Sequence, residues 1–118
     1  MNRGVDVIGN TVIGVELDTD LSDRTVRGID AATNGAARLQ DNTVRDVIVT
    51  NGNGVLAFGI VTGGGHADVT GNSIANTFLG IGCVDGTGMI HGNRASGVIQ
   101  MGFNCDDDGG NIVRTYDQ

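Results

Sequence analysis

The residues with the clearest chemical potential are acidic residues near the end of the chain. Asp106, Asp107 and Asp108 run together, and Asp85 precedes Asp107 by 22 residues. In a fold that repeats at that interval, the carboxylates of Asp85 and Asp107 would stack roughly 5 Å apart. Such a pair raises the pKa of one of its members, or it recruits a cation.

Two kinds of site follow from this pair. A catalytic site would use Asp85 and Asp107 as acid and base on a glycosidic bond, with an arginine such as Arg94 beside them. A metal site would give Ca²⁺ the carboxylates of Asp85, Asp107 and Asp108. A solvated acidic turn is the plainer interpretation, since two glycines follow the run directly. The sequence favours the turn and requires no cofactor.

Other residues that could do chemistry lack the spacing that a known site needs. The segment 16–25 carries four carboxylates, but the glycine and the closing glutamate of an EF-hand loop are missing. His66 and His91 have no cysteine or histidine at ligand spacing. We therefore expect neither an EF-hand nor a zinc site.

Composition excludes several classes of protein. The chain of 118 residues has 21 Gly, no Pro and no Trp, and its net charge is −7. Its seven cations are all arginines, and they are scattered along the chain. No basic patch is present for nucleic acid or for an anionic membrane surface. The length fits a single domain over residues 1–118, and the scarcity of strong helix formers argues against a helical bundle.

The sequence also bears on the compartment. It contains no apolar run of about 18 residues that could cross a membrane, and its N-terminus lacks the apolar core of a signal peptide. Two cysteines do not make a disulfide framework. These features favour a cytoplasmic location.

A short motif centred on an asparagine recurs along the chain. Each copy has an apolar residue three positions before the asparagine and a small or branched apolar residue two positions after it; the copies centre on Asn10, Asn42, Asn72 and Asn93. The spacings are 32, 30 and 21 residues. The additional residues of the first two repeats fall at 16–25 and 48–54, which predicts two protruding loops.

A second set of positions alternates with period two, as the residues of a strand do. Its first copy is Leu56, Phe58 and Ile60, and the later copies are Leu79, Ile81 and Cys83, then Met101, Phe103 and Cys105. The offsets between copies are 23 and 22 residues. The alignment predicts three apolar columns that stack from strand to strand.

A unit of about 22 residues that stacks in register is one coil of a parallel β-helix. Asparagine tolerates the left-handed backbone of a sharp corner, and stacked carboxamides can hydrogen-bond along the axis. We expect an all-β fold, a short parallel β-helix of about four to five coils. The Asn-centred motif resembles the right-handed parallel β-helix repeat of the pectate-lyase-like superfamily. The resemblance implies a right-handed solenoid; enzymes of that superfamily work with acidic residues, often with Ca²⁺, and a basic residue, but none of their catalytic motifs is present.

The end of the chain gives two further expectations. Asn111 resembles a fifth motif, but a 22-residue offset pairs Ile112 with Ile90 and makes Asn111 a decoy. Cys83 and Cys105 fall in one column, where in-register strands hold the Cβ atoms too far apart for a disulfide. Two stacked, buried thiols are therefore expected.

A stack only about 20 Å tall exposes strand edges and core at both ends. We therefore expect a homo-oligomer, most simply a two-fold dimer. Three functions are compatible with the sequence. The favoured one is a non-catalytic binding or assembly module with a glycan along a side sheet; the others are a small polysaccharide lyase or hydrolase using acidic residues with Ca²⁺, and a purely structural protein.

Overall fold

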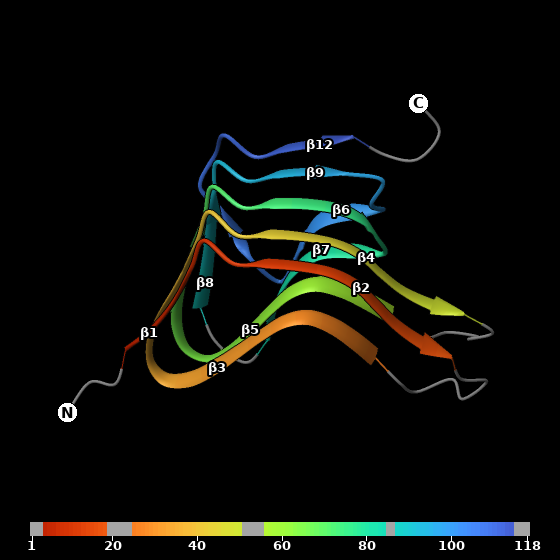
Figure 1. Cartoon of the computed structure of the whole chain (residues 1–118). Coiled ribbons are helices and arrows are strands. Elements are labelled where there is room, and N and C mark those ends of the chain that lie inside the picture. Colours follow the sequence, from red (N-terminus) through yellow and green to blue (C-terminus); the bar gives the residue numbers. More distant parts are fainter. Residues whose placement is uncertain (1–3, 19–24, 51–55, 85–86, 115–118) are drawn as a thin grey trace.

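The chain forms a short solenoid of parallel β-strands in this computed structural model (Figure 1). The structure describes residues 4–18, 25–50, 56–84 and 87–114. Each coil crosses three sheets in turn, and the strands of each sheet stack along the solenoid axis. The parallel β-helix predicted from the repeat is confirmed.

Sheets 1 and 2 share two long strands, β3 and β5, that bend at the corner between them. Sheet 1 precedes the asparagine corner and consists of β1 (Val5–Ile8), the second parts of β3 (Thr25–Gln40) and β5 (Leu56–Thr70), β8 (Thr87–His91) and β11 (Asp106–Asp107). Sheet 2 consists of the first parts of β3 and β5, with β7 (Leu79–Val84) and β10 (Gln100–Phe103). Sheet 3 follows the asparagine corner and consists of β2 (Thr11–Asp18), β4 (Thr43–Thr50), β6 (Ser73–Thr77), β9 (Arg94–Ser96) and β12 (Ile112–Arg114).

The core is a thin column of aliphatic side chains enclosed by the three sheets. Residues that repeat from coil to coil lie over one another, as Leu39, Val69 and Ile90 do in sheet 1. The side chains with no exposed surface are Leu39, Val44, Val47, Ile60, Val69, Ile81 and Val98. Burial of these β-branched and aliphatic residues is the main favourable contribution to folding.

A ladder of asparagine carboxamides holds the corner between sheets 1 and 3. The Oδ1 of Asn72 accepts hydrogen bonds from the backbone N and the Nδ2 of Asn42, both at 2.9 Å. The Nδ2 of Asn72 donates to the Leu39 carbonyl and to the Oδ1 of Asn93, also at 2.9 Å. Asn42 and Asn93 repeat this pattern, and all three residues are 1% exposed. Every polar atom of these carboxamides is bonded, so their burial carries no unsatisfied group.

The left-handed backbone of the corner lies one residue before the position that we expected. The residues with positive φ at this corner are Gly9, Asp41, Gly71, Gly92 and Gly110, with values from 57° to 72°. The ladder asparagines are not among the residues with positive φ. Glycine and aspartate thus make the turn, and asparagine is selected for its carboxamide.

Asn111 is the fifth member of the ladder, so the prediction that it is a decoy is wrong. Its Oδ1 accepts hydrogen bonds from the backbone N and the Nδ2 of Asn93, at 2.9 and 3.0 Å. Ile112 therefore pairs with Arg94, and not with Ile90. Only 18 residues separate Asn93 from Asn111. The last coil is short because its strand in sheet 1 begins directly after Cys105, where Asp106 pairs with Met89.

The predicted strands of sheet 2 are present, but neighbouring strands are offset by 21 residues, and not by the predicted 23 and 22. Phe58 pairs with Leu79, and Ile60 pairs with Ile81. Ile81 in turn pairs with Gly102. The shift of two between β5 and β7 keeps the alternation in phase, so apolar alternation alone does not detect it. The shift of one between β7 and β10 pairs Phe103 with Gly82, so the prediction that Phe103 stacks on Ile81 is wrong.

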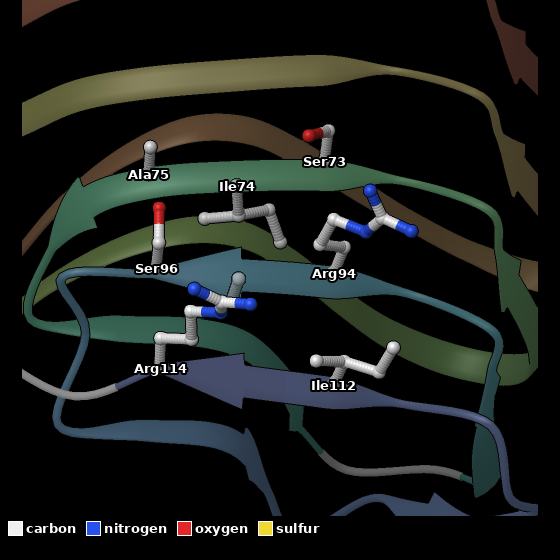
Figure 2. A pocket seen from close by; sticks show the side chains of 8 residues that line it. Ser73, Ile74, Ala75, Arg94, Ser96, Ile112 and Arg114 are labelled. Atoms are coloured by element: carbon white, nitrogen blue, oxygen red, sulfur yellow. The ribbon is translucent and has the colours of Figure 1, made fainter.

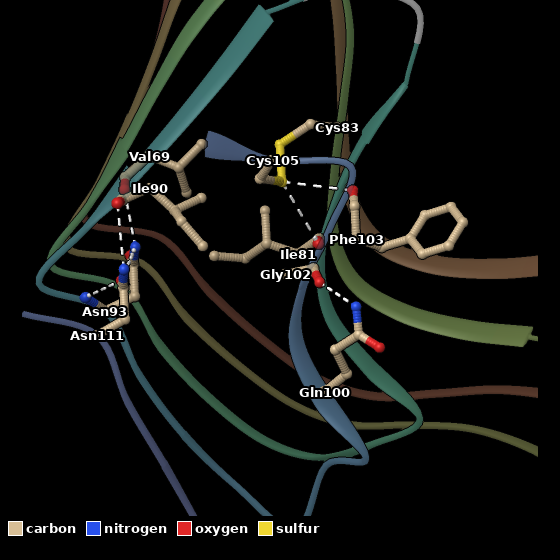
Figure 3. The surroundings of a disulfide bond; sticks show 10 residues. All are labelled: Val69, Ile81, Cys83, Ile90, Asn93, Gln100, Gly102, Phe103, Cys105 and Asn111. Atoms are coloured by element: carbon tan, nitrogen blue, oxygen red, sulfur yellow. Dashed lines mark hydrogen bonds between the residues drawn. A yellow bond between two sulfur atoms is a disulfide. The ribbon is translucent and has the colours of Figure 1, made fainter. Parts of the chain in front are cut away.

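Cys83 and Cys105 form a disulfide, so the prediction of two free thiols is wrong (Figure 3). β10 ends at Phe103, and Asn104 then adopts a φ of 60°. Cys105 thereby leaves the regular ladder and lies 5.1 Å from Cys83, measured between Cα atoms. The predicted separation of the Cβ atoms assumed that the two cysteines are paired directly on continuous parallel strands. Cys105 lies after the end of β10, so that assumption does not hold for this pair. Disulfides are also typical of oxidising compartments, which removes the cysteine argument for the cytoplasm.

The two predicted loops begin as strand. Residues 16–18 extend β2 and residues 48–50 extend β4, and the two extensions pair with each other. Thr25, the last residue of the first predicted loop, begins β3, and the remaining residues, 19–24 and 51–54, lie outside the described residues. Figure 1 shows β2 and β4 reaching beyond β6 at this side of the solenoid.

Loss of the disulfide is expected to lower the free energy of unfolding by about 3 kcal/mol, because it closes a loop of 22 residues in the unfolded chain. Urea unfolding of the wild type and of a C83A/C105A variant measures the difference. Thiol titration of the denatured, unreduced protein should find no free thiol, and two free thiols would contradict the disulfide.

Candidate functional site

The outer face of sheet 3 carries a hollow of about 460 Å³ across β6, β9 and β12 (Figure 2). Its lining residues are Ser73, Ile74, Ala75, Arg94, Ala95, Ser96, Ile112 and Arg114. These strands start directly after the asparagine corner, so the ladder sets their register. One column across the three strands consists of Ser73, Arg94 and Ile112. The column two residues further along consists of Ala75, Ser96 and Arg114.

Arg94 and Arg114 distinguish this hollow from the rest of the surface. Neither guanidinium has a carboxylate partner among the described residues. The other described arginines each have one: Arg27 contacts Asp30 at 2.6 Å, Arg38 contacts Asp6 at 3.1 Å, and Arg45 contacts Asp46 at 3.8 Å. Two positive charges without a carboxylate partner in the described ranges thus lie on adjacent strands of a chain with a net charge of −7.

The neighbouring side chains complement these charges. Ser73 and Ser96 add hydroxyl groups that can donate hydrogen bonds. Ala75 and Ile112 add apolar surface beside them, and Ile112 is 51% exposed. Guanidinium groups bind carboxylates, sulfates and phosphates through paired N–H donors. The hollow can therefore hold an anionic group and contact the carbon skeleton that bears it.

Asp107 has a different surrounding from the one predicted. It pairs with Ile90 in the strand ladder, and Asp85 lies outside the described residues. The Oδ1 of Asp107 accepts hydrogen bonds from the backbone N of Gly109 at 2.9 Å and from the Nδ2 of Asn111 at 2.8 Å. Asp107 thus takes the place that the carboxamide of a further coil would occupy, and it caps the asparagine ladder.

The other predicted site residues are spread over the surface. Asp108 lies beside His91, whose Nδ1 is 3.3 Å from the Asp108 carbonyl and 4.0 Å from its carboxylate. Arg94 lies on sheet 3, whereas Asp107 lies in sheet 1. Within the ranges that the structure describes, no three His, Cys, Asp or Glu side chains gather as they would around a metal ion. The acid pair, its arginine and the Ca²⁺ site stay predictions from sequence.

Sequence reasoning named Arg94 and missed its partner Arg114. Reading Asn111 as a decoy shifted the last strand and moved Arg114 away from Ser96, its actual neighbour. The signal that would have found it is the Asn111 motif, since a fifth motif places Ile112 and Arg114 on the same outer face as Arg94.

Comparison with known proteins gives no relative: no protein-family model, no curated protein and no solved structure matches the chain. Among the described residues, no helix is long and apolar enough to cross a membrane. The chemistry of the hollow therefore rests on the chain's own residues.

Replacement of Asp107 by alanine tests its role as a cap. We expect D107A to lower the free energy of unfolding by about 1 kcal/mol, because the Asn111 carboxamide and the Gly109 amide lose their acceptor. The matched control is D106A, since Asp106 is an exposed neighbour in the same two-residue strand. Equal unfolding midpoints for D107A and D106A in urea would contradict the cap.

Proposed function

We propose that this protein is a non-catalytic binding module that holds an acidic glycan on the outer face of sheet 3. The observation that carries the proposal is the pair Arg94 and Arg114, which lie on adjacent strands with no carboxylate partner in the described part of the chain. Two arginines with no carboxylate partner among the described residues give this face of an acidic protein a local positive potential that attracts an anion.

The arrangement of the two charges favours a chain with repeated acidic groups over a single small anion. Arg114 is one strand and two residues from Arg94, which separates their Cα atoms by roughly 8 Å. Two guanidinium groups at that distance can engage two acidic groups of one polymer. The hydroxyls of Ser73 and Ser96 can bond sugar hydroxyls between them, and Ile112 can pack against a sugar face.

The catalytic alternative has no comparable support. It needs a free carboxylate at Asp107, and that group already accepts two hydrogen bonds within its own turn. Arg94, its proposed cationic partner, belongs to the hollow on another sheet. We therefore propose binding without turnover.

Titration calorimetry with an oligogalacturonate tests the proposal, with a neutral galacto-oligosaccharide of similar length for comparison. We expect binding of the acidic oligomer only, with an affinity that falls as salt is added. R94A and R114A should each weaken binding about tenfold or more, the usual effect of losing one charge-assisted hydrogen bond.

The control variant is R38A, which removes the same charge from sheet 1 where Arg38 is paired with Asp6. It should leave the affinity within about twofold of the wild type, since the two sheets face different solvent regions. Binding of the neutral sugar, or an equal loss in R38A, would contradict the proposed site. No binding of either sugar would leave a purely structural role.

A further inference from the structure

The two ends of the solenoid differ in how well they are closed. At the N-terminal end, three described strand edges have no partner: β1, β2 and the first part of β3, which pairs only with β5. The core side chains of this first coil are only partly buried, as shown by Val7, Val12, Val15, Val26 and Ile29. Their neighbours in the second coil are buried, so the core is open at this end.

The asparagine ladder is also open at the N-terminal end. The Oδ1 of Asn10 accepts no hydrogen bond from a described residue, whereas the Oδ1 of each later ladder asparagine accepts two. At the other end Asp107 caps the ladder, and the disulfide ties the last coil to the one before it. Both ends have unpaired strand edges, those of β10, β11 and β12 at the C-terminal end, and exposed apolar side chains such as Val113. The N-terminal end differs because its ladder has no cap among the described residues and no disulfide ties its first coil to the second.

The edge of β3 has a pattern that is symmetric about its centre. Within residues 26–31, two positions face outward, Arg27 and Asp30. The other four face the core: Val26, Gly28, Ile29 and Ala31. The order of inward and outward positions is therefore the same when the segment is reversed. An antiparallel copy of the same strand, related by a two-fold axis between Gly28 and Ile29, would place inward side chains opposite inward ones. It would also place Arg27 opposite Asp30.

We propose that the N-terminal end is the interface of a two-fold homodimer, in which β3 pairs antiparallel with β3 of a second copy. Charge complementarity selects this occupant. In the single chain, the Arg27 guanidinium contacts the Asp30 carboxylate at 2.6 Å, and the two side chains are 42% and 43% exposed. In the dimer, each guanidinium lies between its own carboxylate and that of the partner, which makes a ring of four alternating charges.

The segments of these 118 residues that lie outside the description are too short to add a coil at this end. The shortest coil spans 18 residues between asparagines, and the segments outside the description are 1–3, 19–24, 51–55, 85–86 and 115–118. None of them is long enough for a coil. A second copy, in contrast, brings matching edges for all three sheets, since the two-fold axis through sheet 2 pairs sheet 1 of one copy with sheet 3 of the other.

Sedimentation velocity over a range of concentrations tests the dimer. The wild type should sediment as a species of twice the 12.1 kDa chain mass, and a monomer at every concentration up to about 100 μM would overturn the proposal. R27D and D30R each place like charges opposite one another across the two-fold axis. Each variant should weaken dimerisation at least about tenfold.

Two restoring experiments separate the proposed pairing from simple damage to the fold. The double variant R27D/D30R reverses both charges and should dimerise as the wild type does. An equimolar mixture of R27D and D30R should form a heterodimer, because one chain then supplies only carboxylates and the other only guanidinium groups.

The matched control is R38D, which reverses a charge on the part of β3 that β1 covers. It should leave the dimer intact. If R27D and D30R dimerise as tightly as the wild type, or if neither the double variant nor the mixture restores the dimer, β3 is not the interface. Neither outcome depends on glycan binding, so this proposal and the proposed function fail separately.

Discussion

The carboxamide hydrogen bonds of Asn42, Asn72 and Asn93 are the interaction on which the rest of this structure depends. Each side chain is buried, and each is acceptable there only because its oxygen accepts two hydrogen bonds and its nitrogen donates two. Those bonds need carboxamides from the coils above and below. The ladder therefore fixes how one coil lies on the next, at the one corner that all coils share.

The same constraint explains why coils of such different length still stack. Asparagine spacings of 32, 30, 21 and 18 residues all return the chain to one corner. Variation in length occurs away from that corner, in the strand extensions of β2 and β4 and in the shortened last coil. The strands of sheet 3 start directly after each asparagine, so their outward columns stay aligned. That alignment is what brings Arg94 and Arg114 to one hollow.

The ladder also gives the solenoid a direction. Asp107 supplies the acceptor that ends it, and at the start no described residue donates to the Oδ1 of Asn10. A carboxylate suits the last position because it accepts the carboxamide N–H and the turn N–H of Gly109 together. The run of aspartates that suggested catalysis is thus used at least in part to finish the fold. The open end is where the proposed dimer forms.

The sequence was informative where side-chain chemistry is specific and less so where it is degenerate. The asparagine motif predicted the parallel coil and the stacking of sheets 1 and 3, since only a carboxamide at that spacing makes the ladder. Sheet 2 has no such marker, and its apolar positions led to offsets that are two residues too long between β5 and β7 and one residue too long between β7 and β10. The disulfide depended on a single left-handed residue, Asn104, which pattern matching does not reveal. The wrong assignment of Asn111 also misplaced the last strand. The sequence therefore did not predict that Arg114 lies beside Arg94 in the candidate site.

Hydrogen exchange of the asparagine side-chain amides, followed by NMR, tests the ladder most directly. Asn76 is the internal reference, because its Nδ2 is also hydrogen-bonded, to Asp46 at 2.9 Å, but lies at the surface. If the buried ladder holds the coils together, the carboxamide protons of Asn42, Asn72 and Asn93 exchange at least about 100-fold more slowly than those of Asn76, since they open only when coils separate. Exchange of all four carboxamides at similar rates would contradict the account.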